Sequence, residues 1–141
     1  MPVKEILVSL ENVPGRLSEV NDYLEQNGIS IIALSVADKA GGHATRLVVS
    51  DPEKAANVLK SHAYSVKMAD VLAVEAPNHP GGLKAVLKPL KEVSANINYF
   101  YTCLGIREHA VLIIGVDKIT EAVQILKENW VHTYNEELYE S

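Results

Sequence analysis

Along the first half of the chain, stretches in which hydrophobic residues recur with the period of a strand are followed by stretches in which they recur with the period of a helix. Leu17, Val20 and Leu24 recur at helical spacing, and Asn27-Gly28 favours a left-handed helix end. Residues that favour turns separate the segments. The pattern predicts a strand at 3–10, a helix at 16–27, a hairpin of strands at 30–38 and 43–50, a helix opened by Asp51-Pro52, and an extended segment at 65–75.

The second half repeats the first. The segment Glu11-Asn-Val-Pro-Gly-Arg-Leu17 returns as Pro77-Asn-His-Pro-Gly-Gly-Leu83, an offset of 66 residues, which becomes 67 after one inserted residue beyond Asp117. A duplicated turn and a duplicated hydrophobic pattern indicate an internal repeat. The repeat predicts a strand at 71–76, a helix at 82–93, a hairpin at 96–106 and 110–117, a helix at 119–129 and a last strand at 131–139.

Strand, helix, strand, strand, helix, strand is the ferredoxin-like βαββαβ order, an antiparallel sheet with both helices on one face. We therefore predict an α+β protein of two such units in tandem, 1–69 and 70–141. Residues 65–76 serve as the last strand of one unit and the first of the next, with a bend near Ala69-Asp70. Units of about 70 residues bury little alone, so we expect them to pack together with a site at their seam. Pro89 predicts a kink in the helix that begins at Gly82.

The amino-acid composition limits the classes of protein to which this chain can belong. The chain is 48% hydrophobic and 22% charged, and no apolar run approaches the length of a membrane span. The first residues lack the features of a secretory signal, so we expect a cytoplasmic protein. The single cysteine, Cys103, excludes an intrachain disulfide. A net charge of -5 argues against nucleic acid as a partner.

Two motifs carry a resemblance to a known family. Glu-Asn-x-Pro-Gly-x-Leu, a helix and Gly-Ile-Ser-Ile in the first half, and Asn-x-Pro-Gly-Gly-Leu, a helix and Ser-Ala-Asn-Ile in the second, resemble ACT domains. These are regulatory modules that sense amino acids. The resemblance covers essentially the whole chain and implies a stand-alone tandem ACT protein without a catalytic domain. It also implies a homodimer, because proteins of this kind pair through edges or helix faces.

The turns themselves have binding chemistry. A Gly-rich turn that runs into a helix leaves backbone N–H groups unpaired at the positive end of the helix dipole, where a carboxylate can bind. Gly81 and Gly82 carry no side chain, so a ligand can approach their backbone closely. Arg16 crowds the first copy or adds a positive charge to it. We therefore favour the second turn.

An α-amino acid also needs a partner for its ammonium, and a side-chain amide offers both a donor and an acceptor. Asn78 and Asn96 can bracket such a zwitterion, and in the resembling family these two positions bear the ligand-binding amides. Asn12 and Asn78 can equally act only as helix caps. The expected ligand-binding residues are Asn78, His79, Pro80, Gly81, Gly82, Leu83, Asn96 and Ile97 in the second copy and Asn12, Val13, Pro14, Gly15, Arg16, Leu17, Ser30 and Ile31 in the first.

Residues Ile97, Tyr99 and Tyr101 follow on one strand, and we expect them to form an apolar wall of the pocket. The five histidines show no metal-ligand spacing, and no cofactor is implied. The favoured function is a non-enzymatic sensor that binds a small amino acid between paired ACT domains and signals its level to a partner. Alternatives are a regulatory subunit of an amino-acid metabolic enzyme, an RNA-binding βαββαβ module without its aromatic signature, and an enzyme without a recognisable catalytic constellation.

Overall fold

The computed structural model describes residues 2–11, 13–39, 42–77, 79–105 and 109–140. The chain forms two compact units. The N-terminal unit is built from Lys4–Ala69 together with the end of the chain from Tyr139 on. The C-terminal unit is built from Asp70–Leu138 together with the first residues up to Val3.

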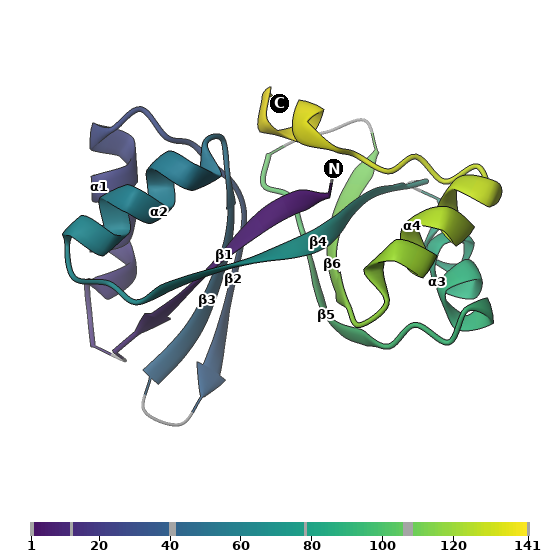
Figure 1. Cartoon of the computed structure of the whole chain (residues 1–141), viewed down its shortest axis with the longest axis horizontal. Helices are drawn as coiled ribbons and strands as arrows, with labels where there is room; N and C mark the ends of the chain where they lie inside the picture. Colours follow the sequence, from purple (N-terminus) through teal and green to yellow (C-terminus); the bar gives the residue numbers. More distant parts are fainter. Residues whose placement is uncertain (1, 12, 40–41, 78, 106–108, 141) are drawn as a thin grey trace. The chain divides into compact units, whose positions relative to one another are not determined.

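The N-terminal unit is an antiparallel sheet with two helices on one face (Figure 1). Strand β3 lies in the middle of the hairpin sheet and pairs with both β1 and β2. Helices α1 and α2 contact each other over a core that includes Ile6, Leu24 and Leu47, all fully buried. The elements are β1 (Val3–Leu10), α1 (Arg16–Gln26), β2 (Ile31–Lys39), β3 (Gly42–Val49), α2 (Pro52–Ser61) and β4 (Val66–Ala76).

The C-terminal unit repeats this arrangement. Strand β4 continues into it, β6 pairs with both β4 and β5, and α3 contacts α4. Its core includes Leu90, Ile114 and Leu126. The elements after β4 are α3 (Gly82–Glu92), β5 (Ile97–Thr102), β6 (Ala110–Val116), α4 (Ile119–Glu128) and the short 3-10 helix η1 (Glu136–Glu140). The predicted α+β fold of tandem βαββαβ units is therefore confirmed, up to the last strand.

The strand predicted at 131–139 is wrong. The chain makes a single bridge between Thr133 and Val74 and then turns into η1. The reason is local, because the Asn135 N–H donates to the Glu137 carboxylate at 3.0 Å. Side chains that bond to nearby backbone compete with strand ladders. Leu138, fully buried, anchors the helical turn that results.

A bulge near the start of the edge strand β5 changes the direction of its side chains. The register shifts between Ile97, opposite Val116, and Tyr99, opposite Gly115. Ile97 therefore joins the core beneath the helices. Tyr99 lies on the other face, where its ring covers Gly115 so closely that a Cβ there would lie 2.3 Å from the ring. The expectation that Ile97, Tyr99 and Tyr101 form one wall is wrong, because the bulge breaks the alternation on which it rested.

The same bulge occurs in the N-terminal unit, between Ile31 and Ala33 of β2. The duplication thus extends to an irregularity of the sheet. In α3 the helix is continuous through Pro89, whose ring is buried. The kink there stays a prediction. No helix among the described residues is long and apolar enough to cross a membrane.

Candidate functional site

Among the residues that the structure describes, the turn before α3 leaves main-chain N–H groups at the start of the helix without a partner. Gly81 caps the helix in the left-handed conformation, with φ at 88°, and without a side-chain hydrogen bond. The Gly82 N–H donates to His79 O at 3.0 Å, but among the described residues the N–H groups of Leu83 and Lys84 have no acceptor outside the helix. All of α3 is described, and its first turn contains no acidic side chain. Uncapped N–H groups and the helix dipole together favour an anion at this position.

The two glycines of this turn have different roles. A Cβ on Gly82 would lie 1.9 Å from Pro77 O, so the absence of a side chain makes room for the protein's own backbone rather than for a ligand. The interpretation of Gly82 as an opening for the ligand is therefore wrong. At Gly81 no atom lies within 4 Å of the equivalent Cβ position. The open approach to the helix end is at Gly81.

The equivalent turn before α1 has the same backbone, with Gly15 also at φ 88°, but a different electrostatic environment. Arg16 lies 3.6 Å from Glu19, which occupies the first turn of α1, and 3.8 Å from Glu11. The Tyr64 hydroxyl donates to Glu19. Burial, this hydrogen bond and the Glu19 charge raise the pKa of Tyr64 to about 12. The N-terminus of α1 is thus already faced by the protein's own carboxylate.

Asn96 lies just before β5, and its amide is held by a carboxylate. The main-chain N–H of Asn96 donates to Asp117 Oδ1 at 2.9 Å, and Nδ2 donates to Oδ2 at 3.1 Å. The backbone hydrogen bond from Asn96 is the main cause that lowers the pKa of Asp117 below its usual value. Among the described residues the side-chain oxygen of Asn96 accepts no hydrogen bond, so it remains available as an acceptor beside a negative charge.

The corresponding position in the first copy is bonded differently. The Ser30 N–H donates to Ser50 Oγ at 2.9 Å, and the Ser50 N–H returns a bond to Ser30 O. Asp51, which aligns with Asp117, instead caps α2 by accepting from the Lys54 N–H. Relative to the repeat, helix α4 begins one residue later than α2, and its cap position is Lys118. Asp117 therefore does not cap α4 and can bind Asn96 instead. Asp117 was not among the site residues predicted from the sequence. The signal that can identify it is the single residue inserted after it, where the offset between the two copies changes from 66 to 67.

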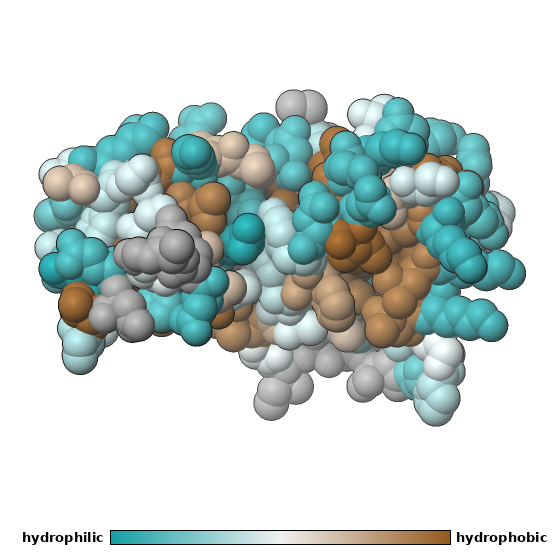
Figure 2. All heavy atoms as spheres, turned by 90° about the horizontal axis from the view of Figure 1, so that it is seen from below, coloured by the Kyte–Doolittle hydropathy of each residue, from teal (hydrophilic) through white to brown (hydrophobic). Residues whose placement is uncertain are grey.

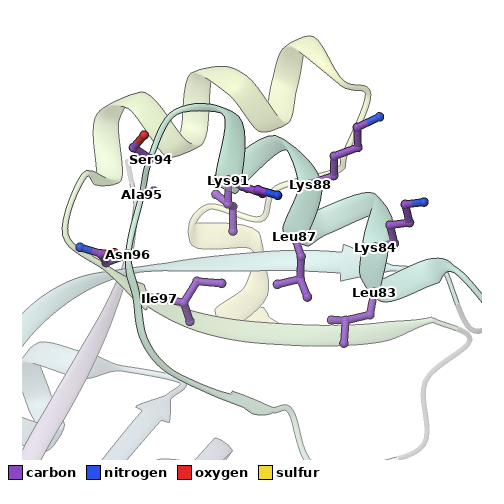
Figure 3. Close-up of a pocket in the computed structure, with 10 residues that line it drawn as sticks. Leu83, Lys84, Leu87, Lys88, Lys91, Ser94, Ala95, Asn96 and Ile97 are labelled. Atoms are coloured by element: carbon purple, nitrogen blue, oxygen red, sulfur yellow. The ribbon is translucent and has the colours of Figure 1, made fainter.

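The open turn and Asn96 lie at opposite ends of α3. The helix has 11 residues and is therefore about 16 Å long. Figure 3 shows Leu83 at one end of the groove beside α3 and Asn96 at the other. The ammonium and carboxylate of an α-amino acid share one carbon atom. One ligand consequently cannot contact both ends of α3 in the same unit. The bracketing by Asn78 and Asn96 expected from sequence stays a prediction, because Asn78 lies outside the described residues.

The groove between these ends has a volume of about 1060 Å³. Its apolar lining includes Leu83, Leu87 and Ile97, and its rim carries Lys84, Lys88 and Lys91 (Figure 3). The lysines were not among the residues expected from sequence. A smaller hollow of about 210 Å³ lies against Ala85 and Val86 and is bordered by Trp130, whose side chain is 95% exposed.

The remaining predicted residues flank the two turns. Asn12 and Asn78 lie outside the described residues. His79 Nδ1 lies 2.8 Å from Pro80 O on the surface. Val13 and Pro14 are exposed, whereas Leu17 and Ile31 pack partly against the N-terminal core. Among the described residues no group of three or more His, Cys, Asp or Glu side chains can hold a metal ion.

Comparison with known proteins places the chain in a family. The family model described as an ACT domain pair matches residues 1–140. Protein BT0572 from Bacteroides thetaiotaomicron superposes with a TM-score of 0.92 at 33% identity, over 100% of this chain and 98% of that chain. No protein with a curated description matches the sequence.

More distant structures share the fold. The regulatory subunit of aspartate kinase from Thermus flavus superposes with a TM-score of 0.62 at 14% identity. The corresponding subunit from Thermus thermophilus, in a ligand-free form, gives 0.67 at 12%. Each match covers 92% of this chain and 94% of the other. With a family model matched along nearly its entire length, the chain belongs to the ACT family as a pair of ACT domains.

Proposed function

We propose that this ACT pair is a non-enzymatic regulatory protein that binds a small α-amino acid. The N-terminus of α3 receives the carboxylate, and Asn96 with Asp117 receives the ammonium. Because these groups lie at opposite ends of α3, each ligand uses one end, and the remaining contacts come from an ACT unit of a second copy. The observation that carries the proposal is the hydrogen-bonded pair Asn96–Asp117.

The electrostatics of the pair support this assignment. The side-chain NH2 group of Asn96 donates a hydrogen bond to Asp117, and the side-chain oxygen of Asn96 can accept a hydrogen bond from an ammonium. The Asp117 carboxylate stays ionised well below neutral pH, because Asn96 donates to it. A charge-assisted hydrogen bond to an ammonium is therefore available at this position.

The helix end supports binding of the other half of the ligand. Leu83 and Lys84 offer main-chain N–H groups, and the Lys84 side chain adds a positive charge in the first turn of α3. The α1 terminus is a weaker candidate because Glu19 lies in its first turn. The neighbours named as regulatory subunits of aspartate kinase suggest the kind of partner that reads the occupancy, an enzyme of amino-acid metabolism.

A thermal-shift panel of the twenty amino acids tests binding directly. A ligand at 100 times its dissociation constant stabilises the folded protein by about 2.7 kcal/mol. Titration calorimetry with the active amino acid then compares variants. Asn96→Ala is expected to weaken binding by about 1–3 kcal/mol, since it removes a hydrogen-bond partner of a charged group. The matched control Ser30→Ala is expected to have a smaller effect.

Two outcomes contradict the proposal. One is the absence of a shift with all twenty amino acids. The other is chemical turnover of the amino acid that binds, which is checked by recovering the ligand unaltered after incubation. If Ser30→Ala abolishes binding while Asn96→Ala does not, the site belongs to the first copy.

A further inference from the structure

The C-terminal unit has a small hollow that the proposed amino-acid binding does not use. Its volume is about 210 Å³, and Ala85, Val86 and Val131 form an apolar floor. Among the described residues it shares no lining residue with the groove beside α3. Figure 2 shows exposed apolar side chains surrounded by polar ones on this unit. Trp130, at the border of the hollow, is the most exposed large apolar residue that the structure describes.

The N-terminal unit has a corresponding hollow, with a volume of about 350 Å³. Most of its described lining positions match those of the C-terminal hollow at the repeat offsets of 66 and 67 residues. Glu19 corresponds to Ala85, and Tyr64 corresponds to Val131. The duplication therefore produced the same surface twice, and the differences between the copies show how its chemistry changed.

The first hollow contains a set of polar side chains that bind one another. Arg16 lies 3.6 Å from Glu19, and the Tyr64 hydroxyl donates to the same carboxylate. The repeat equivalents of these three residues are Gly82, Ala85 and Val131. The second hollow thus lacks the cation, the carboxylate and the phenol that are bonded together in the first.

A carboxylate enters the second hollow from a different element. Glu75 of β4 replaces Ser9, and its side chain is 27% exposed. Its Oε1 lies 3.3 Å from His109 Nε2, and in the described part of the chain no lysine or arginine forms an ion pair with it. The other oxygen, Oε2, accepts no hydrogen bond from the described residues. The second hollow therefore has a carboxylate beside an apolar floor, without a guanidinium like that of Arg16.

Trp130 occupies a backbone position that favours small residues. It follows α4 in the left-handed conformation, with φ at 62°. After helices α1, α2 and α3 the same conformation is adopted by Gly28, Ala63 and Ser94. A bulky residue is strained there, and a side chain that is 95% exposed gains little packing to compensate. Strained residues of this kind cluster at ligand sites.

An exposed indole ring beside a carboxylate is suited to one class of ligand. The face of tryptophan attracts cations more strongly than the faces of the other aromatic side chains. A guanidinium is planar, stacks on an aromatic face and binds a carboxylate through two parallel hydrogen bonds. The hollow is smaller than the roughly 300 Å³ at which pockets for drug-sized ligands begin, so its ligand has few heavy atoms.

We propose that this hollow binds a small alkylguanidinium cation. The carboxylate of Glu75 binds the guanidinium, Trp130 stacks on its planar face, and the short carbon chain lies against the apolar floor. The ligand thereby supplies the cation that Arg16 provides in the first copy. This site is separate from the proposed amino-acid site, whose contacts are at the N-terminus of α3 and at Asn96.

Fluorescence titration of the full chain tests the proposal. Trp130 is the only tryptophan in the sequence, so its emission reports on this hollow alone. The probe is butylguanidinium, and the control is butylurea, which has nearly the same shape without the charge. A saturable change in emission is expected with butylguanidinium at millimolar concentration or below, and no saturable change is expected with butylurea. Titration calorimetry gives the dissociation constant of the same complex.

Variants identify the groups that bind the cation. Glu75→Gln and Trp130→Ala are each expected to raise the dissociation constant, measured by calorimetry, by about tenfold or more. Glu92→Gln makes the same change of charge at an exposed position of α3 and is expected to bind butylguanidinium like the wild type. Asn96→Ala is expected to retain butylguanidinium binding while it weakens amino-acid binding. Circular dichroism checks that each variant is folded.

The proposal is overturned if butylguanidinium shows no saturable binding, if butylurea binds equally well, or if folded Glu75→Gln or Trp130→Ala binds like the wild type. It is also overturned if Asn96→Ala abolishes butylguanidinium binding, because the cation then lies at the proposed ammonium site. Thermal shift of Glu75→Gln with amino acids is expected to equal that of the wild type, which separates failure of this site from failure of the proposed function.

Discussion

Asn96 donates two hydrogen bonds to one carboxylate, that of Asp117, from its main-chain N–H and its side-chain amide. Asp51, the repeat equivalent of Asp117, uses its carboxylate to cap a helix. The two copies therefore use the same residue type for different purposes. This difference allows a matched pair of substitutions.

Asp117→Ala is expected to weaken amino-acid binding about tenfold, because it removes the negative charge beside Asn96 that attracts the ligand's ammonium. Its melting temperature is expected to change little, because the side chain is exposed. Asp51→Ala is the control and is expected to lower stability by about 0.5–2 kcal/mol through loss of the cap while leaving binding unchanged. Calorimetry and urea unfolding measure the two effects. Equal effects of both variants on binding contradict the assignment.

The binding affinity is expected to depend on acid pH through the same carboxylate. The folded-state pKa of Asp117 is lowered, mainly because the Asn96 N–H donates to it. Its contribution to folding stability is fully present above the unfolded pKa and is lost as the pH falls through the lowered folded pKa. Ligand binding needs the ionised carboxylate of the folded protein, so the affinity is lost only as the pH falls through the same lowered pKa. We expect a constant affinity from neutral pH down to the ordinary pKa of an aspartate and a decline only at more acid pH, because the pKa of Asp117 lies below that ordinary value. The Asp117→Ala variant lacks this decline; a wild-type affinity that falls already between pH 7 and 5 contradicts the prediction.

Gly82→Ala is expected to destabilise the C-terminal unit by about 1–3 kcal/mol, the usual cost of overpacking. The added Cβ would lie 1.9 Å from Pro77 O, a backbone atom that cannot rotate away. Arg16 occupies the equivalent position of the first copy and already carries a Cβ. Arg16→Ala is therefore expected to change the free energy of unfolding by less than about 1 kcal/mol, the usual contribution of exposed ion pairs. Urea midpoints measure both. A Gly82→Ala protein as stable as the wild type would show that the turn can open.

Tyr64 is expected to ionise later than an ordinary tyrosine. Burial and its bond to Glu19 raise its pKa from 10.0 to about 12. A raised folded pKa means that the neutral phenol stabilises the fold below the unfolded pKa, and that this contribution is lost as the pH rises through about 12. Absorbance titration of phenolate follows the group, with Tyr64→Phe to identify it. Glu19→Gln is expected to lower the midpoint, and an unchanged midpoint would remove Glu19 as a cause.

Leu126→Ala is expected to lower the free energy of unfolding by about 2–5 kcal/mol, because Leu126 is fully buried in the core of the C-terminal unit. Trp130, four residues later, is 95% exposed. Trp130→Ala is expected to change stability by less than about 0.5 kcal/mol. Chemical denaturation compares the two. A large loss from Trp130→Ala would mean that this side chain is covered in solution.

The order of the elements could be predicted from the sequence because it depends on local patterns. Helical spacing at Leu17, Val20 and Leu24 and the cap at Asp51 operate within a few residues, and both are found in the structure. The strand after Val131 could not be predicted correctly. Its alternation is outweighed by the bond between Asn135 and Glu137, a competition that alternation alone does not reveal.

The site was harder to predict because its geometry is not local. The bulge that turns Ile97 away from Tyr99 depends on pairing with β6, and the close contact at Gly82 depends on the path of Pro77. The spacing of Asn78 and Asn96 identified amides but not the length of the helix between them. The different side chains that line the two hollows were readable from sequence once the two copies were compared position by position.

The ends of the chain have a practical consequence for anyone who divides this protein. The Lys4 N–H donates to the Tyr139 hydroxyl at 2.8 Å, and both residues belong to the N-terminal unit. A cut between the repeats after Ala69 divides β4 and strips Tyr139 from the fragment that contains Lys4. The repeat is a unit of gene duplication, whereas a fragment suited to expression must follow the borders of packing. Reagents built from single repeats are accordingly poor substitutes for the intact chain.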